Sequence, residues 1–306
     1  MGKIAFVFSG QGAQYSGMGK SLYENSELAK KLYDEAEKIR KGTMAQSFSG
    51  DDIELKKTEN TQPCLYLVDL ASALALNENG IYADAVAGFS LGEIAALAYA
   101  KAYTYADGFK IVAKRGEFMG KCAGKEKTAM AAVLKLDAET VDNTAKEFEK
   151  LYAVNFNCPG QTVVSGLEDS LNGFSERIKE LGGRVVPLAV SGAFHSSFMS
   201  DAADEFAGIL GDFEIIAPRI PVYANLTSEP YGEDVRDYMT KQIKNPVKWQ
   251  QTIENMISEG FTDFIEVGAG KTLSGLIKKI SKEVNVYSVE DAETLQKTIQ
   301  AVKENA

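Results

Sequence analysis

Histidine and cysteine are scarce in this chain of 306 residues, which contains one histidine, His195, and three cysteines, Cys64, Cys122 and Cys158. The cysteines are odd in number and far apart, without CxxC or Cys/His ligand spacing. A disulfide framework and a zinc site are therefore not expected. Because His195 is the only imidazole, a reaction that needs a histidine base has one candidate.

Basic charge and long apolar runs are also lacking. The 33 Lys and Arg residues against 43 Asp and Glu residues give a net charge of −10 at pH 7. This balance argues against nucleic acid as a partner, because phosphate binding needs a dominant basic surface. No apolar run reaches the length of a membrane span, and the first residues, MGKIAFVFSG, are typical of a strand rather than a signal peptide. Phe6 stands where a myristoylation pattern needs Ser or Thr. We expect a cytoplasmic protein with no membrane association.

Strand-like and helix-like patterns alternate through most of the chain and predict an α/β fold with a mostly parallel sheet. Apolar strands are expected at 3–8 and 84–89, and a helix capped by Ser26 at 26–42. Further helices are expected at 62–80, 91–103, 106–121, 197–210, 249–260 and 270–282, and further extended segments at 219–225, 262–268 and 284–289.

A different order appears between residues 127 and 190. Strand, helix, strand, strand, helix and strand patterns follow one another there, which is the βαββαβ order of a ferredoxin-like unit. We therefore predict a small inserted domain at 127–190 and a discontinuous main domain made of 1–126 and 191–306.

The segment GFSLG at 88–92 matches the G-x-S-x-G pattern of a nucleophile elbow. An apolar strand precedes it and a helix follows, so the Ser90 hydroxyl would stand exposed above the sheet. The helix N-terminus favours negative charge, and the amide of Leu91 would point toward an oxyanion. A plain turn with Ser90 as N-cap remains the alternative.

A serine nucleophile needs a general base, and His195 is the candidate. It lies in the segment AVSGAFHSSFM, a loop of small and polar residues after the last strand of the predicted small domain. The alternative is a buried histidine that only makes a structural hydrogen bond.

Two further features carry less specific signals. The loop FSGQGAQYSGMGKS completes neither phosphate-binding pattern, because Tyr15 and Gln14 stand where glycines are needed. Gln11 in this loop could instead help form an oxyanion hole. Arg115, in AKRGEFMG, could grip a carboxylate with two hydrogen bonds, or be an ordinary charge on a helix face.

Nine segments in order resemble the malonyl-CoA:acyl carrier protein transacylases of type II fatty acid synthesis, and are similar also to the acyltransferase domains of polyketide synthases. They cover nearly the whole chain: FVFSGQGAQYSGMG (6–19), TQPCLYL (61–67), GFSLGE (88–93), KRGEFM (114–119), NCPGQTVVSG (157–166), GAFHSSFM (192–199), VYANLTSEP (222–230), NPVKW (245–249) and EVGAGKTLSGLIKKI (266–280). The resemblance implies a hydrolase-like α/β core with an inserted ferredoxin-like domain.

The resemblance also implies residue roles. Ser90 would be the acylated nucleophile and His195 its base, as a dyad in which a backbone carbonyl near Lys248 orients the imidazole. Gln11 and the Leu91 amide would form the oxyanion hole. The malonyl carboxylate would pair with Arg115, near Met119, and Phe194 would crowd an α-methyl group, which is worth only about 1–3 kcal/mol of selectivity.

Two positions depart from the family pattern. Phe89 stands where most members have the histidine of Gly-His-Ser, which removes a polar neighbour of the nucleophile and bears on the selection of the acyl group. Gly268-Ala269-Gly270 replaces the usual Gly-Pro-Gly near the C-terminal strand.

The implied activity is ping-pong transfer of malonyl from malonyl-CoA to the phosphopantetheine thiol of acyl carrier protein, by a monomer without metal or cofactor. A trans-acting acyltransferase of a polyketide pathway, a serine hydrolase and a nucleotide-binding module are the alternatives. An acidic carrier would need a local basic face. Candidate lysines for that face are Lys241, Lys244, Lys248, Lys271, Lys278, Lys279 and Lys282.

Overall fold

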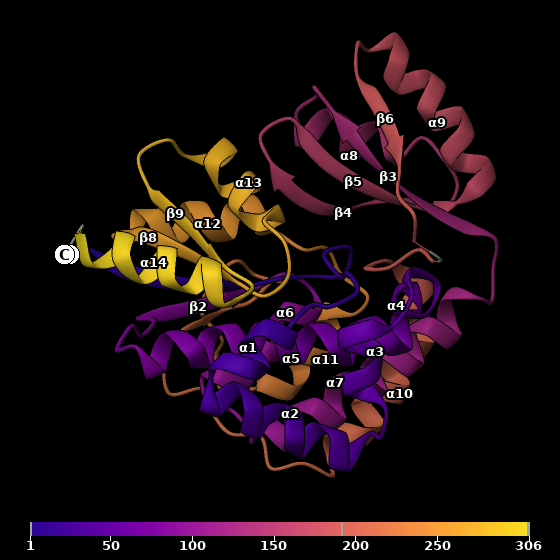
Figure 1. Ribbon diagram of the computed structural model, residues 1–306. Coiled ribbons are helices and arrows are strands. Elements are labelled where there is room, and N and C mark those ends of the chain that lie inside the picture. Colours follow the sequence, from indigo (N-terminus) through magenta and orange to yellow (C-terminus); the bar gives the residue numbers. More distant parts are fainter. Residues whose placement is uncertain (1, 191, 305–306) are drawn as a thin grey trace.

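The larger part of the chain is built on a five-stranded parallel sheet in the order β7-β2-β1-β8-β9 (Figure 1). The computed structural model describes residues 2–190 and 192–304. The strands are β1 (Lys3–Phe8), β2 (Ala85–Gly88), β7 (Val222–Tyr223), β8 (Phe261–Val267) and β9 (Asn285–Val289).

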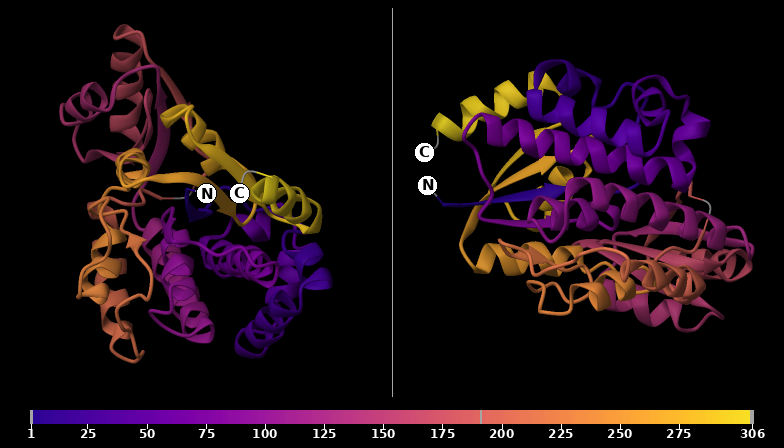
Figure 2. Two further views of the ribbon diagram at one scale, coloured as in Figure 1. Left: turned by 90° about the vertical axis from the view of Figure 1, so that its left-hand side faces the viewer. Right: turned by 90° about the horizontal axis from the view of Figure 1, so that it is seen from below.

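Helices cover both faces of this sheet, as the views in Figure 2 show. Alternate residues of β1 enter different cores: Phe6 and Phe8 pack on the side of the helices of the first half, and Ala5 and Val7 pack with Trp249. Such two-sided burial is typical of parallel strands. The helices are α1 (Lys20–Asn25), α2 (Glu27–Ile39), α3 (Thr43–Ser49), α4 (Asp52–Lys56), α5 (Thr58–Glu78), α6 (Leu91–Tyr99), α7 (Tyr105–Ala123), α10 (Ser200–Leu210, after the short 3₁₀ turn Ser197–Met199), α11 (Val235–Gln242), α12 (Trp249–Ser258), α13 (Thr272–Ile280) and α14 (Ala292–Glu304).

The second sheet is antiparallel, with four strands in the order β4-β5-β3-β6, and lies beside the larger unit (Figure 1). Along β3, Ala131 and Val133 pack under two helices, whereas Met130 and Ala132 join the core of the larger unit. The inner face of the small sheet therefore closes over the larger unit. Its elements are β3 (Thr128–Leu134), α8 (Ala138–Ala145), β4 (Leu151–Cys158), β5 (Gln161–Leu167), α9 (Glu168–Glu180) and β6 (Arg184–Pro187).

These sheets confirm the predicted fold class, a mostly parallel α/β core with a βαββαβ unit between its halves. The division into domains at 126/127 and 190/191 stays a prediction, and its second boundary falls on position 191, outside the described residues. The two units share backbone contacts, because β4 also pairs with Val247: the amide of Val247 donates to Val154 O (2.8 Å) and that of Phe156 to Val247 O (2.9 Å).

Several element boundaries follow local signals. Ser26 caps α2 as predicted, its side chain accepting from the amide of Ala29. The helix expected at 62–80 begins earlier, at Thr58, and contains Pro63 in its second turn. Helix α11 was not predicted from the sequence.

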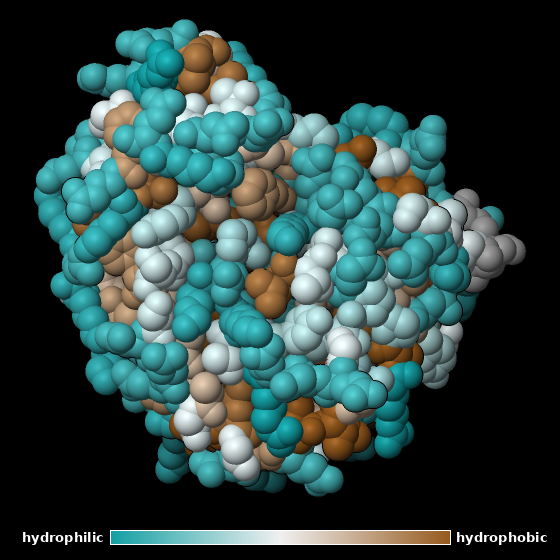
Figure 3. All heavy atoms as spheres, turned by 180° about the vertical axis from the view of Figure 1, so that it is seen from behind, coloured by the Kyte–Doolittle hydropathy of each residue, from teal (hydrophilic) through white to brown (hydrophobic). Residues whose placement is uncertain are grey.

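No helix within residues 2–190 and 192–304 is long and apolar enough to cross a membrane. Figure 3 shows one face of the molecule, on which hydrophilic residues predominate and hydrophobic ones form separate patches.

Candidate active site

Ser90 lies at a sharp turn between the end of β2 and the start of α6, with φ 55° and ψ −105°. Two glycines make the turn possible. A Cβ on Gly88 would lie 2.0 Å from the Gly92 carbonyl carbon, and one on Gly92 would lie 2.3 Å from the carbonyl oxygen of Phe8. The backbone therefore has the strained strand–turn–helix form of a nucleophile elbow.

His195 reaches Ser90 from the loop before α10, although the two residues are 105 positions apart. Its Nε2 lies 2.8 Å from Ser90 Oγ. Its Nδ1 lies 2.9 Å from the carbonyl oxygen of Gln242 and 3.2 Å from that of Asn245. Because both groups at Nδ1 are acceptors, Nδ1 carries the proton and Nε2 is free to accept the hydrogen of the Ser90 hydroxyl.

The carbonyl that orients His195 was predicted in the segment NPVKW, at Lys248; of that segment Asn245 faces Nδ1 instead. The Lys248 carbonyl accepts from the amide of Thr252 at 3.0 Å and from its hydroxyl at 2.9 Å, because Lys248 is the N-cap of α12. The carbonyls that face the imidazole belong to Gln242, the last residue of α11, and to Asn245 just beyond it. The last carbonyls of a helix have no partner within it, so they are available to the histidine.

The imidazole of His195 is buried, with 4% of its surface exposed. Burial lowers its pKa to about 4, and the positive charge of Arg115 contributes to this shift, against the opposing effect of the two carbonyls. The ring is therefore neutral near pH 7, which is the state a general base requires.

Arg115 of α7 lies fully buried beside Ser90. Its Nη1 donates to Gln62 Oε1 at 2.8 Å, and its Nη2 donates to Gln242 Oε1 at 2.8 Å and to Ser90 Oγ at 3.2 Å. Burial lowers its pKa to about 10, so it stays charged at neutral pH. Within the described residues its hydrogen-bond partners are neutral, and its Nε has none. Among the residues that the structure describes, no carboxylate hydrogen-bonds this cation, although the nearby charge of Glu93 acts to raise its pKa.

Two amide side chains that the sequence did not single out surround Ser90. Asn225 Oδ1 accepts from the Ser90 amide at 2.8 Å, and Asn225 Nδ2 donates to Gly88 O at 2.6 Å. Gln242 Nε2 donates to Ser90 O at 2.7 Å. The backbone of Ser90 is therefore held on both sides by side chains from distant segments.

The loop after β1 lies against the elbow. A Cβ on Gly10 would lie 2.9 Å from the Phe89 carbonyl oxygen. Gly10 therefore touches the turn that carries Ser90, and Gln11 is the next residue in the chain. Gln11 Nε2 donates weakly to Thr58 Oγ1 at 3.4 Å. Leu91 is the first residue of α6, where amides have no acceptor within the helix.

Met119 and Phe194 are both buried and belong to the same hydrophobic core. Met119 follows Arg115 by one turn of α7, and its sulfur accepts from Gln62 Nε2 at 3.5 Å. Phe194 directly precedes His195, and its carbonyl accepts from Ser165 Oγ at 3.2 Å. The structure thus brings Ser90, His195 and Arg115 into direct contact. The roles of the other predicted residues stay predictions.

Two hollows lie close to these residues, one lined by Phe89, which precedes Ser90, and one lined by His195. One, of about 220 Å³, lies between the loop Gly10–Ala13, Phe89, the small sheet and the start of α13. The Oδ1 atoms of Asn155 and Asn157, which line it, are buried without a hydrogen-bond partner among the described residues. The other, of about 460 Å³, is lined by His195 and the segment Lys244–Pro246.

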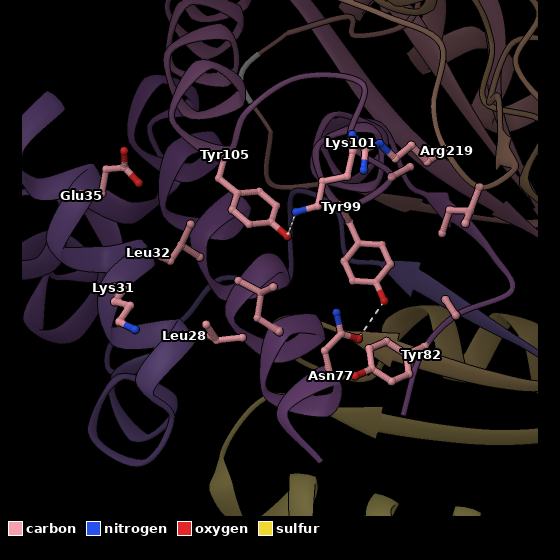
Figure 4. Close-up of a pocket in the computed structure, with 14 residues that line it drawn as sticks. Leu28, Lys31, Leu32, Glu35, Asn77, Tyr82, Tyr99, Lys101, Tyr105 and Arg219 are labelled. Atoms are coloured by element: carbon pink, nitrogen blue, oxygen red, sulfur yellow. Dashed lines mark hydrogen bonds between the residues drawn. The ribbon is translucent and has the colours of Figure 1, made fainter. Parts of the chain in front are cut away.

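A third hollow, of about 550 Å³, lies away from these residues (Figure 4). It opens between α2, α5 and the C-terminal end of α6, whereas Ser90 precedes the N-terminal end of α6. Figure 4 shows Tyr99 bonded to Asn77, and Lys101 bonded to Tyr105, on its walls. It contains none of the candidate site residues.

No group of three or more His, Cys, Asp or Glu side chains within residues 2–190 and 192–304 is arranged to hold a metal ion.

Relatives of known name match this chain over nearly its whole length. The malonyl CoA-acyl carrier protein transacylase of Bacillus subtilis (strain 168) is 41% identical over 312 residues, covering 99% of this chain and 98% of the relative. That of Staphylococcus aureus (strain MSSA476) is 38% identical, covering 97% and 98%.

Solved structures agree. The crystal structure of malonyl CoA-acyl carrier protein transacylase from Clostridium perfringens superposes with a TM-score of 0.96 at 37% identity, over 99% of this chain and 98% of that one. A malonyl-transacylase in complex with its type II PKS acyl-carrier protein (PlMCAT:AntF, holo) superposes with a TM-score of 0.93 at 31% identity, over 98% and 99%. The sequence profile of the acyl transferase domain family matches residues 5–305. With this match, and with relatives of this identity and coverage, the chain belongs to the acyl transferase domain family.

Proposed function

We propose that this protein transfers a malonyl group from malonyl-CoA to the phosphopantetheine thiol of an acyl carrier protein, through an ester on Ser90. One observation carries the proposal: a serine–histidine pair 2.8 Å apart stands directly beside a buried arginine whose hydrogen-bond partners within residues 2–190 and 192–304 are neutral. The names of the relatives point to the same donor and acceptor.

The first half-reaction forms the acyl-enzyme. His195 Nε2 takes the proton of Ser90 Oγ as Oγ attacks the thioester carbonyl of malonyl-CoA. The negative charge that develops on the carbonyl oxygen is stabilised by the Leu91 amide, the helix α6 N-terminus and Gln11. When the tetrahedral intermediate collapses, the C–S bond breaks and the CoA sulfur leaves with the proton from His195.

The second half-reaction reverses the chemistry with a new thiol. His195 takes the proton of the phosphopantetheine thiol, its sulfur attacks the ester carbonyl, and Ser90 Oγ leaves with that proton. Electron pairs and protons move only among Ser90, His195, the thioester and the thiol. The proposed cycle therefore needs no metal or redox cofactor.

Arg115 selects the acyl group in this proposal. The fold has already desolvated its charge, so a malonyl carboxylate that displaces the weak contact to Ser90 Oγ would form charge-assisted hydrogen bonds that offset the desolvation of the carboxylate, with no further desolvation of Arg115. An acetyl group offers no such partner. Met119 and Phe194 would form the apolar side of the same pocket.

The hollow next to Phe89 suits the pantetheine arm of both substrates. A pantetheine arm carries amide N–H groups, and the unpartnered Oδ1 atoms of Asn155 and Asn157 are acceptors for them. Buried acceptors without a partner are rare in folded proteins, which supports a ligand as their missing donor.

Carrier docking is proposed at α13, the helix that borders this hollow. Lys278 and Lys279 lie in its last turn, and Lys279 Nζ contacts Gln161 Oε1 at 3.4 Å on the rim. By contrast, Lys241 pairs with Asp237 and Lys244 with Asp204, so their charges are partly neutralised. Because one chain supplies every group of the site, we expect the protein to act as a monomer, in the cytoplasm.

Intact-mass spectrometry tests the function. Mixing the protein with malonyl-CoA should add one malonyl group, and adding holo-acyl carrier protein should then move it to the carrier. Ser90→Ala should give neither product, because no other described side chain is paired with His195 Nε2 in this way.

The opposing results are equally defined. An adduct that persists in Ser90→Ala would place the nucleophile elsewhere. Rapid release of CoA without a malonylated carrier would show that water is the acceptor and that the protein is a hydrolase.

A further inference from the structure

A buried carboxylate, Glu93, stands three residues after Ser90 and is not used in the proposed reaction. It lies in the first turn of α6 and is 0% exposed. Buried carboxylates are costly unless they are hydrogen-bonded, so its contacts indicate what it does.

Glu93 binds both arms of the loop that follows β7. Its Oε2 accepts from the backbone amide of Asn225 at 2.5 Å, and its Oε1 accepts from the hydroxyl of Tyr231. Between these residues the chain reverses, with the amide of Ala224 donating to Glu229 O at 2.9 Å. One carboxylate thus fixes the position of the loop relative to α6.

The loop in turn fixes Ser90. The side chain of Asn225 spans the elbow, accepting from the Ser90 amide (2.8 Å) and donating to the Gly88 carbonyl (2.6 Å). Its Oδ1 also accepts from Gln242 Nε2 at 3.3 Å, and Gln242 bonds the Ser90 carbonyl. The backbone carbonyl of Asn225 accepts from the Lys248 amide at 3.0 Å, close to the segment that faces His195.

These contacts hold the backbone of Ser90 in a strained conformation. A non-glycine residue at φ 55°, ψ −105° lies outside the well-populated regions, and such a conformation persists only where its surroundings impose it. Asn225 and Gln242 hold the amide and the carbonyl of Ser90, and Glu93 holds Asn225. No other carboxylate among the described residues forms a hydrogen bond to this set.

We propose that Glu93 is a positioning residue for the nucleophile, which acts through the Asn225 amide and the Tyr231 hydroxyl to hold Ser90 Oγ at the imidazole of His195. This inference rests on the proposed function, since it assumes that Ser90 is acylated. The groups charged or titratable around Glu93 are Tyr231, Tyr103 and Arg115. Burial raises the pKa of Glu93 to about 7, while Tyr231, Asn225 and Arg115 act to lower it.

The test is the rate constant of malonyl-Ser90 formation at saturating malonyl-CoA, followed by rapid quench and intact mass. Glu93→Ala should slow acylation by about 100-fold, because misplacing a reacting group by roughly 1 Å costs that much. The KM for malonyl-CoA should stay within about threefold of wild type, because the lost contacts do not touch the substrate. Glu93→Gln should recover at least about tenfold of the loss, because its amide oxygen can still accept from the Asn225 amide.

A matched pair separates positioning from stability. Tyr231→Phe and Tyr103→Phe each remove one buried hydroxyl that bonds α6, since Tyr103 donates to Ile94 O at 2.8 Å. Both should lower the melting temperature, but only Tyr231→Phe should slow acylation, by roughly tenfold. This pair also carries the test if Glu93→Ala fails to fold.

The outcomes that overturn the inference are distinct from a failure of the function. If wild type forms no adduct on Ser90, the proposed function fails. If wild type does form it, the inference is overturned by Glu93→Ala acylating within about threefold of wild type, by Glu93→Gln being no faster than Glu93→Ala, or by Tyr103→Phe slowing acylation as much as Tyr231→Phe.

Discussion

At the scale of single residues, the site is defined by a neutral base beside a fixed cation. His195 is buried and Arg115 repels a second positive charge, so both factors favour the neutral imidazole and lower its pKa. The carbonyls of Gln242 and Asn245 hold its proton on Nδ1 and compensate only in part. His195 is therefore neutral, and able to accept a proton, over an unusually wide range of acidic pH.

This arrangement predicts the acid limb of the pH profile. In the free enzyme, the pKa of His195 of about 4 means that the base form is lost only as pH falls through about 4, not through 6.5. The kcat/KM for acylation, measured from CoA release, should therefore hold down to about pH 5 in protein shown by circular dichroism to remain folded. Arg115→Ala removes the repelling charge, so with acetyl-CoA as donor its acid limb should move to higher pH.

Glu93 titrates within the pH range of this profile and needs its own control. Its pKa is about 7, so the profile should be repeated in Glu93→Gln, which has no titrating group at this position. An acid limb near pH 6.5 in that variant, or an acid limb that does not shift between wild type and Arg115→Ala, would contradict the account of the His195 pKa.

Part of the site could be predicted from the sequence, because some residues carry a local signal. Ser90 has its elbow pattern, His195 is the only imidazole, and Arg115 lies in a family segment. Asn225 and Gln242 lie 135 and 152 positions from Ser90. Asn225 falls in the family segment VYANLTSEP and Gln242 lies outside the family segments, but neither pattern indicates a contact with Ser90, so only the fold shows their role. A backbone carbonyl leaves no trace in a side-chain pattern, so the sequence cannot distinguish Lys248 from Gln242 and Asn245 as the partner of His195.

At the scale of elements, the contact between β1 and α6 positions the elbow against the loop that carries Gln11. Gly92 in the first turn of α6 meets the carbonyl oxygens of Phe8 and Ser9, which leave no room for a side chain. The missing Cβ lets the start of α6 approach the end of β1, where the loop that carries Gln11 begins.

Gly92→Ala should therefore push the start of α6 away from the end of β1. Its Cβ would lie 2.3 and 2.5 Å from backbone oxygens, which cannot rotate away. We expect a loss of stability of about 1–3 kcal/mol or more in thermal unfolding, with slower acylation. Gly275→Ala in α13 is the control, because nothing lies within 4 Å of its Cβ, and it should stabilise by about 0.5–1 kcal/mol. Equal effects of the two changes would disprove the close-approach argument.

Elements with a strong periodic pattern were predictable and weak ones were not. The strand at 3–8 and the cap at Ser26 were placed correctly because burial and capping are local properties. Helix α11 escaped prediction since only Val235, Met239 and Gln242 of its residues are buried, too few apolar positions for a recognisable stripe. Its end nevertheless supplies the carbonyl and amide that organise His195 and Ser90.

At the scale of the whole molecule, the site lies where the two sheets meet. The alternation of patterns predicted both units, but the order β7-β2-β1-β8-β9 joins strands from opposite ends of the chain and has no local signature. The pairing of Val247 with β4 ties the small sheet to the segment next to His195. Glu93 and Asn225, the buried polar groups that hold Ser90, lie in this region, so they link function to stability.

Glu93 makes that link measurable as a pH dependence of global stability. Its pKa is about 7 in the folded protein and 4.5 without the fold, so between these values the folded state keeps a proton that the unfolded state has released. The free energy of unfolding that Glu93 contributes is thus present below pH 4.5 and is lost as pH rises through about 7.

The Glu93→Gln variant has no titrating group at this position. Between about pH 4.5 and about pH 7, the difference in unfolding free energy between wild type and this variant should therefore change in the variant's favour by up to about 3 kcal/mol. Urea unfolding at about pH 5 and about pH 8 measures it. His195, whose depressed pKa acts in the opposite direction, is present in both proteins and cancels from the difference. Tyr103→Phe keeps Glu93 and should show a difference from wild type that does not vary with pH. If the difference for Glu93→Gln is also constant with pH, ionisation of Glu93 does not lower the stability of the folded protein. That result would contradict the raised pKa of Glu93.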